Sequence, residues 1–447
     1  MLVVGAGPAG LATALGLADR GADVAVLERG DEVGGRVRTI GVDGHRVELG
    51  PAGILDDAPD TQRLLARLGA AAPATLAADP RVRRRYVVRD GRPRALPTGP
   101  LSLLFGTTLT WRERIALLRE PRVPRGDDAA ETVAGFARRR FGASIAEAFA
   151  QPIVVGIFGG DYEALELRAA FPKVAALEAA HGSVVRGLRA EAAARRKAGR
   201  PRAGLVTFDG GMGALPRALA GRLGDRVRLG CGVVAIERHG PGVRARLDDG
   251  TVVAADRAVL AVPPEAAAEL VAPLDAPLGG LLAATASVPI ASVSLGWADG
   301  ELAHPLDGFG LLVPRGAGYK TLGVLFMSSI FPTVRAAPPG RVLLRALVGG
   351  ANDPRIGDLD DEAVLALAEA EVAALLGARA PASFRHVQRW PDAIPQYTVG
   401  HLARAEQIDA RARALGLELV GTALRGVGVN DVLRDAAGAV ERLAGGG

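Results

Sequence analysis

A glycine-rich turn near the start of the chain restricts its fold more than any other segment. Residues 2–4 are apolar and suit a short buried strand, and the glycines that follow are spaced Gly5-x-Gly7-x-x-Gly10. Gly5 permits a tight turn, Gly7 lets the backbone approach a pyrophosphate, and Gly10 lets a helix pack closely on the strand. A helix predicted over residues 11–19 presents free N–H groups and the positive end of its dipole to phosphates.

The segment after this helix completes the pattern of a dinucleotide-binding unit. Residues 22–27 are predicted to form a second strand, which ends on Glu28. A carboxylate at this position can accept the ribose hydroxyls of an adenosine and disfavours a 2′-phosphate, which an arginine would bind. Arg29 comes one residue too late to change that interpretation. Glycine-rich turns also occur for purely conformational reasons, but the order of strand, glycines, helix, strand and acid predicts a dinucleotide site.

Composition restricts the class of protein further. The 447 residues are too many for one simple core and predict two or three domains. The single cysteine, Cys231, cannot form an internal disulfide and suits a reducing cytoplasm. The histidines are scattered without metal-ligand spacing, so we expect no metal site. Met1 directly precedes the first strand and leaves no room for a signal peptide. The longest uncharged run, 276–298, contains prolines and paired glycines and is not expected to span a membrane.

The charge balance is basic, with a formal net charge of +5. No nucleic-acid-binding module is visible and aromatic residues are sparse, so we expect no nucleic-acid partner. Attraction to an anionic substrate or to anionic lipid heads explains the charge equally well. The highest charge density lies in residues 81–97, which are predicted to form two strands around an Asp90-Gly91 turn. Most of its arginines are expected to lie on a solvated edge.

An apolar cluster with almost no charge precedes Arg112, at the start of a stretch predicted to be helical to about residue 188. A packed core is the favoured interpretation, and a surface that touches a bilayer is the alternative. We therefore expect a cytoplasmic protein and leave open a peripheral contact with the cytoplasmic membrane. The members of the cluster are Leu101, Leu103, Leu104, Phe105, Leu109 and Trp111.

The paired glycines and arginine Gly34-Gly35-Arg36 indicate which dinucleotide is bound. They resemble the segment that follows the second strand in flavin amine oxidases, where it lies against the pyrophosphate of FAD. An arginine suits this place because its planar fork can bond two phosphate oxygens at once. A surface loop with a solvated charge is the alternative for this tripeptide in isolation. Directly after the glycine-rich turn, it favours FAD.

Further motifs make nearly the whole chain resemble the protoporphyrinogen oxidase family, which also includes coproporphyrinogen III oxidases. The first and last motifs are shared across the flavin superfamily, whereas the runs at 308–314 and 394–401 are far more specific. The remaining motifs lie at residues 48–51, 156–161, 171–173, 178–183, 208–215 and 426–431.

The resemblance implies an α/β fold in which a discontinuous, Rossmann-like FAD-binding domain carries two insertions. One insertion is helical, and the other is a mixed-sheet α+β substrate domain. The expected division places the FAD-binding domain at 1–70, 205–264 and 401–447, the substrate domain at 71–97 and 265–400, and the helical domain, with its potential membrane contact, at 98–204.

The activity implied by the resemblance is removal of six electrons from an anionic porphyrinogen in haem biosynthesis. A hydride passes from a meso carbon to flavin N5, and oxygen reoxidises the flavin and yields hydrogen peroxide. The cofactor carries the difficult chemistry while the protein orients the substrate, so we assign no residue as a catalytic acid or base. We expect a monomer or a homodimer.

The resemblance also implies a substrate site. Phe309 and Leu312 are expected to pack on the face of the tetrapyrrole, and Leu347 to help wall the pocket. Gly156 should offer its backbone carbonyl to the pyrrole nitrogens, which are all donors. Arg85 matches the arginine that pairs with a propionate. Each has a plainer alternative: core packing for Phe309, a turn for Gly156, and a solvated charge for Arg85.

The expected FAD contacts come from both ends of the chain. Residues near the C-terminus should approach the pyrimidine end of the flavin as the last helix starts, and Val233 should contact adenine through its backbone. The dipole of that helix would stabilise a reduced, anionic flavin. The cofactor-binding residues are expected to be Gly5, Gly7, Pro8, Ala9, Gly10, Glu28, Arg29, Gly35, Arg36, Gly50, Pro51, Val233, Gly421, Val427, Val429, Asn430 and Asp431.

Several alternatives remain at this stage. Protoporphyrinogen IX is the favoured substrate, but coproporphyrinogen III, with more propionates, would also suit the basic stretch at 81–94. An amine oxidase would carry a lysine near flavin N5, and the strand at 288–293 has none. A phytoene-desaturase-like enzyme or a non-catalytic carrier on the same fold would leave the specific motifs unexplained.

Overall fold

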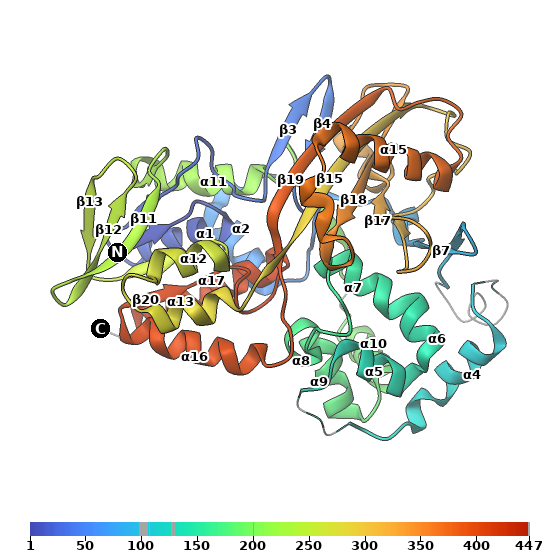
Figure 1. The fold of residues 1–447 in the computed structure, drawn as a ribbon, viewed down its shortest axis with the longest axis horizontal. Helices are drawn as coiled ribbons and strands as arrows, with labels where there is room; N and C mark the ends of the chain where they lie inside the picture. The colour runs from blue at the N-terminus through green and yellow to red at the C-terminus, as the bar shows by residue number, and fades with distance from the viewer. Residues whose placement is uncertain (98–105, 107, 127, 129, 200, 446–447) are drawn as a thin grey trace.

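The computed structural model describes residues 1–97, 106, 108–126, 128, 130–199 and 201–445 (Figure 1). Leu101, Leu103, Leu104 and Phe105 of the predicted apolar cluster lie outside the described residues. Of its other members, Leu109 is buried, as the packed-core interpretation predicts, whereas the Trp111 side chain is 70% exposed.

A five-stranded parallel sheet with the order β10-β2-β1-β14-β20 contains the N-terminal strand. Its strands come from three separate stretches of the chain, which confirms a discontinuous α/β arrangement. Their bounds are β1 (Leu2–Val4), β2 (Ala25–Leu27), β10 (Val227–Arg228), β14 (Ala258–Leu260) and β20 (Leu417–Leu419).

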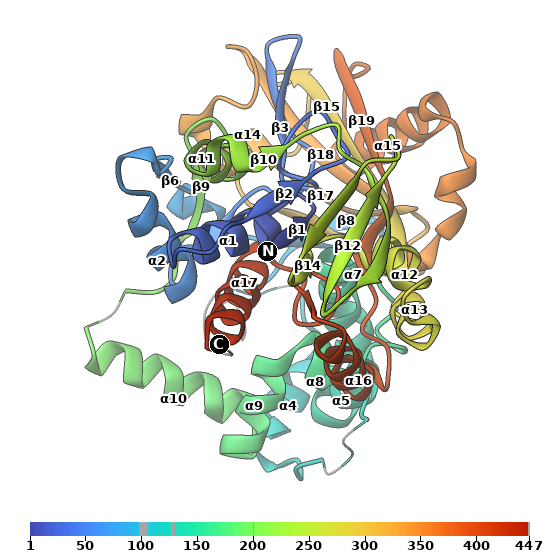
Figure 2. The same cartoon turned by 90° about the vertical axis from the view of Figure 1, so that its left-hand side faces the viewer.

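Both faces of this sheet are covered, as parallel sheets require (Figure 2). Successive side chains of β1 alternate between two cores: Val3 belongs to one, and Leu2 and Val4 belong to the other. The first core includes α1 (Pro8–Ala18), α11 (Ala214–Leu223) and α17 (Val429–Ala444). The second includes β11 (Val233–His239), β12 (Gly242–Leu247), β13 (Val252–Ala255), α12 (Pro264–Val271), α13 (Ala276–Ala283) and α16 (His401–Ala414).

The first helix and second strand differ in length from the prediction. Helix α1 begins at Pro8 rather than at Leu11, because proline suits the first helical position, where its missing N–H would have no partner. Strand β2 is limited to Ala25–Leu27. The glycine-rich turn therefore lies partly inside the first turn of the helix, which brings Gly10 against the preceding strand.

A seven-stranded mixed sheet, β19-β15-β18-β17-β16-β7-β8, forms the second layer of the molecule. Among its described strand pairs, only β16 with β7 is parallel, and α15 (Asp361–Leu376) packs on one face (Figure 1). The predicted Asp90-Gly91 turn joins β7 and β8 with positive φ at both residues. The strands are β7 (Tyr86–Arg89), β8 (Arg92–Ala95), β15 (Ser287–Ala298), β16 (Gly310–Leu312), β17 (Thr321–Leu325), β18 (Arg341–Gly349) and β19 (Phe384–Pro395).

A helical group, drawn in cyan and green, lies below the mixed sheet in Figure 1. A buried ion pair between Arg140 and Glu120, 2.7 Å apart, ties its segments together. Helix α10 continues to Lys197, beyond the helical stretch predicted to about residue 188, because cations in its last turn complement the helix dipole. The helices are α4 (Trp111–Arg119), α5 (Val133–Phe141), α6 (Ala143–Ile145), α7 (Gln151–Phe158), α8 (Leu167–Ala170), α9 (Pro172–His181) and α10 (Val184–Lys197).

Small elements connect the two sheets. After the glycine-rich segment, β3 (Thr39–Val42) and β4 (His45–Glu48) form an antiparallel hairpin. The other small elements are helix α2 (Pro59–Leu68) and a three-stranded sheet. The strands of this sheet are β5 (Ile54–Leu55), β9 (Leu205–Phe208) and β6 (Thr75–Ala77). The predicted combination of a parallel sheet with a separate mixed sheet is thus confirmed.

Candidate functional site

The glycine-rich turn lies at the carboxyl end of β1, where α/β sheets bind ligands. Gly5 has φ +102°, which only glycine adopts readily. A Cβ on Gly10 would lie 2.0 Å from the carbonyl oxygen of Gly5, so helix and strand pack as closely as the spacing predicts. The chain itself thus requires glycine at both positions.

Gly7 is different, because nothing in the chain requires a glycine there. Its φ of −74° and ψ of 174° suit any residue, and a Cβ built on it would meet no atom within 4 Å. The same open space is bordered by Gly35, whose own Cβ would lie 3.5 Å from the Gly7 Cα. A backbone bare of side chains, at the N-terminus of α1, fits a phosphate that approaches the main chain.

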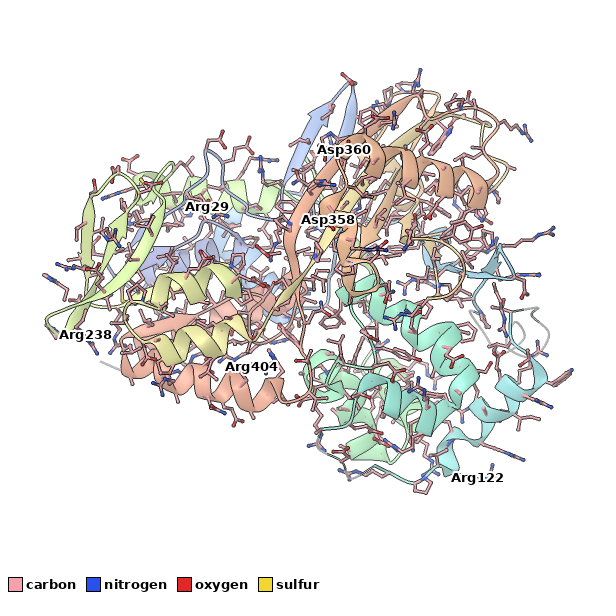
Figure 3. All side chains as sticks on the ribbon, in the orientation of Figure 1. Arg29, Arg122, Arg238, Asp358, Asp360 and Arg404 are labelled. Atoms are coloured by element: carbon pink, nitrogen blue, oxygen red, sulfur yellow. The ribbon has the colours of Figure 1, made fainter. Side chains whose placement is uncertain are left out.

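Glu28 lies at the carboxyl end of the neighbouring strand. Its two carboxylate oxygens accept hydrogen bonds from the Ala6 N–H, at 2.8 Å, and the Gly30 N–H, at 2.9 Å. Each oxygen keeps further lone pairs that can accept a ribose hydroxyl. The Cys231 N–H donates to the Glu28 carbonyl at 2.8 Å, which places Val233, at the start of β11, beside this edge. Arg29 is exposed on the surface (Figure 3).

Arg36 connects the nucleotide side of the site with the mixed sheet. Its guanidinium donates to the Asp392 carbonyl on β19. Burial lowers the pKa of Arg36, and the nearby carboxylates of Glu265 and Asp392 partly offset this effect. Gly50 approaches the same residue so closely that a Cβ would lie 1.9 Å from the Arg36 carbonyl oxygen. This close contact brings Gly50 and Pro51 to the junction of the two sheets.

Two residues that the sequence did not single out, Arg345 and Trp390, fix this junction. Arg345 donates to the carbonyls of Glu48, at 3.1 Å, and Gly50, and the Trp390 indole donates to the Leu49 carbonyl at 2.8 Å. Burial lowers the pKa of Arg345 to about 10, although the negative charge of Glu48 acts to raise it. Arg345 lies in a β18 segment otherwise rich in apolar residues. This isolated cation is the sequence feature that could have indicated its structural role.

The C-terminal residues close the cofactor region from the side of β20. A Cβ on Gly421 would lie 3.5 Å from Cβ of Ala9 on α1, so the two chain ends meet there. Helix α17 begins at Val429. The Asn430 side chain accepts from the Thr61 hydroxyl at 2.8 Å and donates to the Leu55 carbonyl at 2.9 Å. Its amide therefore connects the start of α17 to α2 and β5.

Val427 and Asp431 complete the C-terminal set. Asp431 packs on Gly426, where a Cβ would lie 2.6 Å from the Asp431 Cβ, and pairs with Arg434 at 2.8 Å. Val427 packs against the core of the helical group. The fold therefore gathers both ends of the chain around one edge of the parallel sheet.

The expected substrate residues lie on the mixed sheet and on α7. A Cβ on Gly156 would lie 2.8 Å from Cδ2 of Leu312, so helix and strand meet at this pair. Leu347 on β18 packs in one apolar cluster with Val155, the residue before Gly156. Gly156 lies inside a helix, which excludes the interpretation of this residue as a mere turn.

Helix α7 presents an unusual apolar face to solvent. Ile153 and Ile157 are 43% and 46% exposed, and Gly156 between them is exposed as well. Residues three and four apart share one helix face, so these residues form an open wall beside Leu312. Flat apolar walls of this kind are typical of pockets for large ring systems.

Arg85 supplies positive charge at the edge of this wall. Its guanidinium carbon lies 5.0 Å from the centre of the Phe309 ring. Desolvation lowers the pKa of Arg85, and the nearby positive charge of Arg202 adds to that effect. Within the described part of the chain, no carboxylate pairs with either arginine. Two guanidiniums without acidic partners can attract an anion.

Other possible sites receive less support. Among the described residues, no cluster of three or more His, Cys, Asp or Glu side chains could hold a metal ion. In the same part of the chain, no helix is long and apolar enough to cross a membrane. A cavity of about 710 Å³ opens beside Met1, Asp23 and Arg222, but it lies at the amino end of β1, opposite to the ligand edge of such sheets.

Comparison with known proteins agrees with this geometry. The family model for flavin containing amine oxidoreductases matches residues 8–444. Protoporphyrinogen oxidase from Bos taurus is 31% identical over 100% of this chain and 98% of its own length. Coproporphyrinogen III oxidase from Bacillus subtilis (strain 168) is 26% identical over 98% and 97% of the two chains.

Solved structures show the same fold. A protein from Exiguobacterium sp. 255-15, assigned provisionally to the protoporphyrinogen oxidases, has a TM-score of 0.84 at 24% identity, with 99% of this chain and 98% of that chain covered. Reduced UDP-galactopyranose mutase has a TM-score of 0.75 at 16% identity, over 99% and 95% of the two chains. The chain therefore belongs to the flavin-containing amine oxidoreductases and, among them, to the protoporphyrinogen oxidase family, and it is an FAD-dependent oxidoreductase.

Proposed function

We propose that this protein oxidises a porphyrinogen in haem biosynthesis, with protoporphyrinogen IX as substrate and coproporphyrinogen III as the alternative. The observation that carries the proposal is the apolar wall of Ile153, Gly156 and Ile157 beside Leu312, with Arg85 at its edge. A porphyrinogen combines the same two properties, a large apolar ring and peripheral carboxylates. Names of the relatives support this chemistry, since they include protoporphyrinogen and coproporphyrinogen III oxidases.

The carbonyl of Gly156 is the group that would orient the ring. Carbonyls in the last turn of a helix lack intrahelical partners. The Gly159 N–H donates to the carbonyl of Val155, the residue before Gly156, at 2.9 Å. Within the described residues, no backbone N–H of the following loop donates to Gly156. This carbonyl can accept hydrogen bonds from pyrrole N–H groups and so present one face of the ring to the cofactor.

Bound FAD supplies the two-electron acceptor, and we propose that the chain holds it in two places. Gly7, Glu28 and Arg36 would bind the ADP portion at the carboxyl ends of β1 and β2. Gly421 and residues 427–431 would meet the flavin ring. The mixed sheet would cover the ring and exclude water, because Arg345 and Trp390 hold the 48–50 backbone against it.

The choice between the two porphyrinogens depends on charge at the pocket edge. Arg85 and Arg202 suit the propionates that both substrates carry, whereas the other exposed arginines of 81–94 include Arg81 and Arg84, which already pair with Asp79 and Asp307. With these two engaged, fewer cations remain for the additional propionates of coproporphyrinogen III, and Arg83, Arg92 and Arg94 are the other arginines of the stretch without an ion-pair partner among the described residues. We therefore propose protoporphyrinogen IX as the preferred substrate.

We propose oxygen as the electron acceptor, with hydrogen peroxide as its product. The test is to measure oxygen uptake and peroxide release with both porphyrinogens at matched concentrations. We expect peroxide to form in proportion to porphyrin and kcat/KM to be higher for protoporphyrinogen IX. A higher kcat/KM for coproporphyrinogen III would make that porphyrinogen the preferred substrate. If neither porphyrinogen is oxidised, the proposal is rejected.

We propose a cytoplasmic location with a peripheral membrane contact, and helix α4 supports that contact. Trp111, Ile115 and Leu118 are 70%, 44% and 58% exposed and share one helix face. Arg112 and Arg119 flank that face, and Arg122 lies just beyond it (Figure 3), as expected for a helix in an anionic interface. Sedimentation with anionic vesicles should fall sharply in W111S/L118S, and equal sedimentation of that variant would contradict the contact.

A further inference from the structure

The segment 396–401 links the two halves of the candidate site. It joins the end of β19 to α16, and the side chains of Gln396, Tyr397 and His401 all point back to other elements. The amide of Gln396 donates to the carbonyl of Phe158, at the end of α7, at 2.9 Å. A Cβ on Gly160 would lie 2.3 Å from Oε1 of Gln396, so the helix end is tightly packed on this side chain.

The Tyr397 hydroxyl makes two hydrogen bonds to the backbone of the loop 421–428. It donates to the Thr422 carbonyl at 2.6 Å and accepts from the Gly426 N–H at 2.9 Å. The residue is fully buried. Burial raises the pKa of Tyr397, so the hydroxyl keeps the proton that it needs for donation. One oxygen therefore holds the loop at two points, residues 422 and 426.

His401 holds the middle of the same loop. Its Nε2 donates to the Leu424 carbonyl at 2.9 Å, and its ring stacks on Tyr397 with centroids 4.0 Å apart. The Phe158 ring of α7 packs edge-on against Tyr397, with ring centroids 5.9 Å apart. Substrate wall and loop thus share one aromatic cluster.

We infer that Gln396, Tyr397 and His401 are positioning residues that hold α7 and the loop 421–428 at a fixed separation. The inference rests on the proposed placement of the substrate against Gly156 and of the flavin against Gly421. A hydride transfer depends steeply on the distance between donor and acceptor atoms. The segment would set that distance without touching either molecule.

The test uses two conservative variants with matched controls in the full-length protein. Y397F keeps the ring and removes the hydroxyl, and Y162F is its control, since the buried Tyr162 hydroxyl meets Arg138 instead. Q396M removes the amide at constant length. Its control is Q388M, on β19 shortly before it; among the described residues, the Gln388 amide donates to the adjacent Arg389 carbonyl at 2.8 Å.

The readouts are the dissociation constant of FAD from reconstituted apoprotein and amide hydrogen exchange of peptides covering 151–160 and 421–428. In Y397F we expect FAD affinity to fall about tenfold and exchange of 421–428 to rise by a similar factor. In Q396M we expect faster exchange of 151–160 with FAD affinity within about twofold of the native value. Both controls should match the native protein.

Unchanged FAD affinity in Y397F, or an equal loss in Y162F, would overturn the inference. If Y397F does not fold, H401F tests the same loop, because it keeps an aromatic ring and removes the donor to Leu424; the same loss of affinity is expected. None of these readouts uses a porphyrinogen. Failure of the proposed substrate assay is therefore distinguishable from failure of this inference.

Discussion

The guanidinium of Arg85 lies over the ring of Phe309, with Cζ 5.0 Å from the ring centre. This contact joins the one charged residue expected at the substrate to the aromatic residue expected on its face. It also restricts the arginine rotamer, since a cation over a ring is held by about 0.5–1 kcal/mol at an exposed site. Arg85 is therefore a preoriented partner for a carboxylate.

Replacing Arg85 tests its pairing with a propionate. R85A should lower kcat/KM by roughly ten- to a hundredfold, because a hydrogen bond to a charged group contributes about 1.5–3 kcal/mol. R85K should recover part of the loss, since lysine keeps the charge and loses the planar fork. R92A, on the paired strand of the same hairpin, is the control. Equal kinetics for R85A and R92A would remove Arg85 from the site.

Substitution of Gly156 tests the apolar wall. A Cβ there would lie 2.8 Å from the flexible end of Leu312, so G156A should fold and G156L should project into the proposed ring position. We expect KM to rise at least about tenfold in G156L, in line with the 1–3 kcal/mol cost of overpacking. G221A is the control, because Gly221 lies in α11 with no atom near its Cβ. Native KM in G156L would place the ring elsewhere.

Gly7 and Gly10 should respond to alanine in opposite ways. G10A brings a Cβ to 2.0 Å from the Gly5 carbonyl, so its apoprotein should unfold at a lower temperature, as overpacking by about 1–3 kcal/mol predicts. G7A has free space and ordinary dihedral angles, so its apoprotein should keep its melting temperature and bind FAD weakly. Thermal unfolding and FAD titration separate the two outcomes. Normal FAD affinity in G7A would show that the phosphates lie away from this turn.

Acid should destabilise the protein partly through His401. Burial lowers the pKa of this residue from 6.5 to about 4, so the unfolded chain binds a proton between these values and the folded chain does not. Stability should therefore fall as pH decreases through this window, by up to roughly 3 kcal/mol from this residue. H401Q keeps a donor for Leu424 and cannot titrate. The stability difference between native protein and H401Q should shrink as pH falls from 7 to 5, as measured by urea unfolding, with exposed H181Q as control; a constant difference would contradict the assignment.

Local patterns predicted the first elements well because their causes are local. Glycine spacing, the apolar triplet and the terminal acid each act within a few residues, so β1, α1, β2 and Glu28 could be located from the chain alone. The ends of helices were less certain: Pro8 starts α1 earlier than expected, and α10 extends to Lys197, beyond the helical stretch predicted to about residue 188. Capping and dipole effects shift such boundaries at small energetic cost.

The roles of Arg345, Trp390 and Tyr397 could not be predicted in the same way. Arg345 and Trp390 act on the carbonyls of residues 48–50, hundreds of positions away in the sequence. Tyr397 lay in a recognised motif, yet its use became visible only where the hydroxyl meets Thr422 and Gly426. A hydrogen bond across the fold leaves no periodic pattern in either segment.

The sequence by itself determined that a dinucleotide binds, because the glycine spacing, Glu28 and Arg36 are requirements of short-range backbone geometry and charge. Tertiary structure decided which surfaces face each other. The juxtapositions of Gly156 with Leu312, of Arg85 with Phe309 and of Tyr397 with the 421–428 loop depend on how two sheets and a helical group pack. Those contacts form only when distant segments bury their apolar faces together, since burial of apolar surface is the dominant driving force of folding.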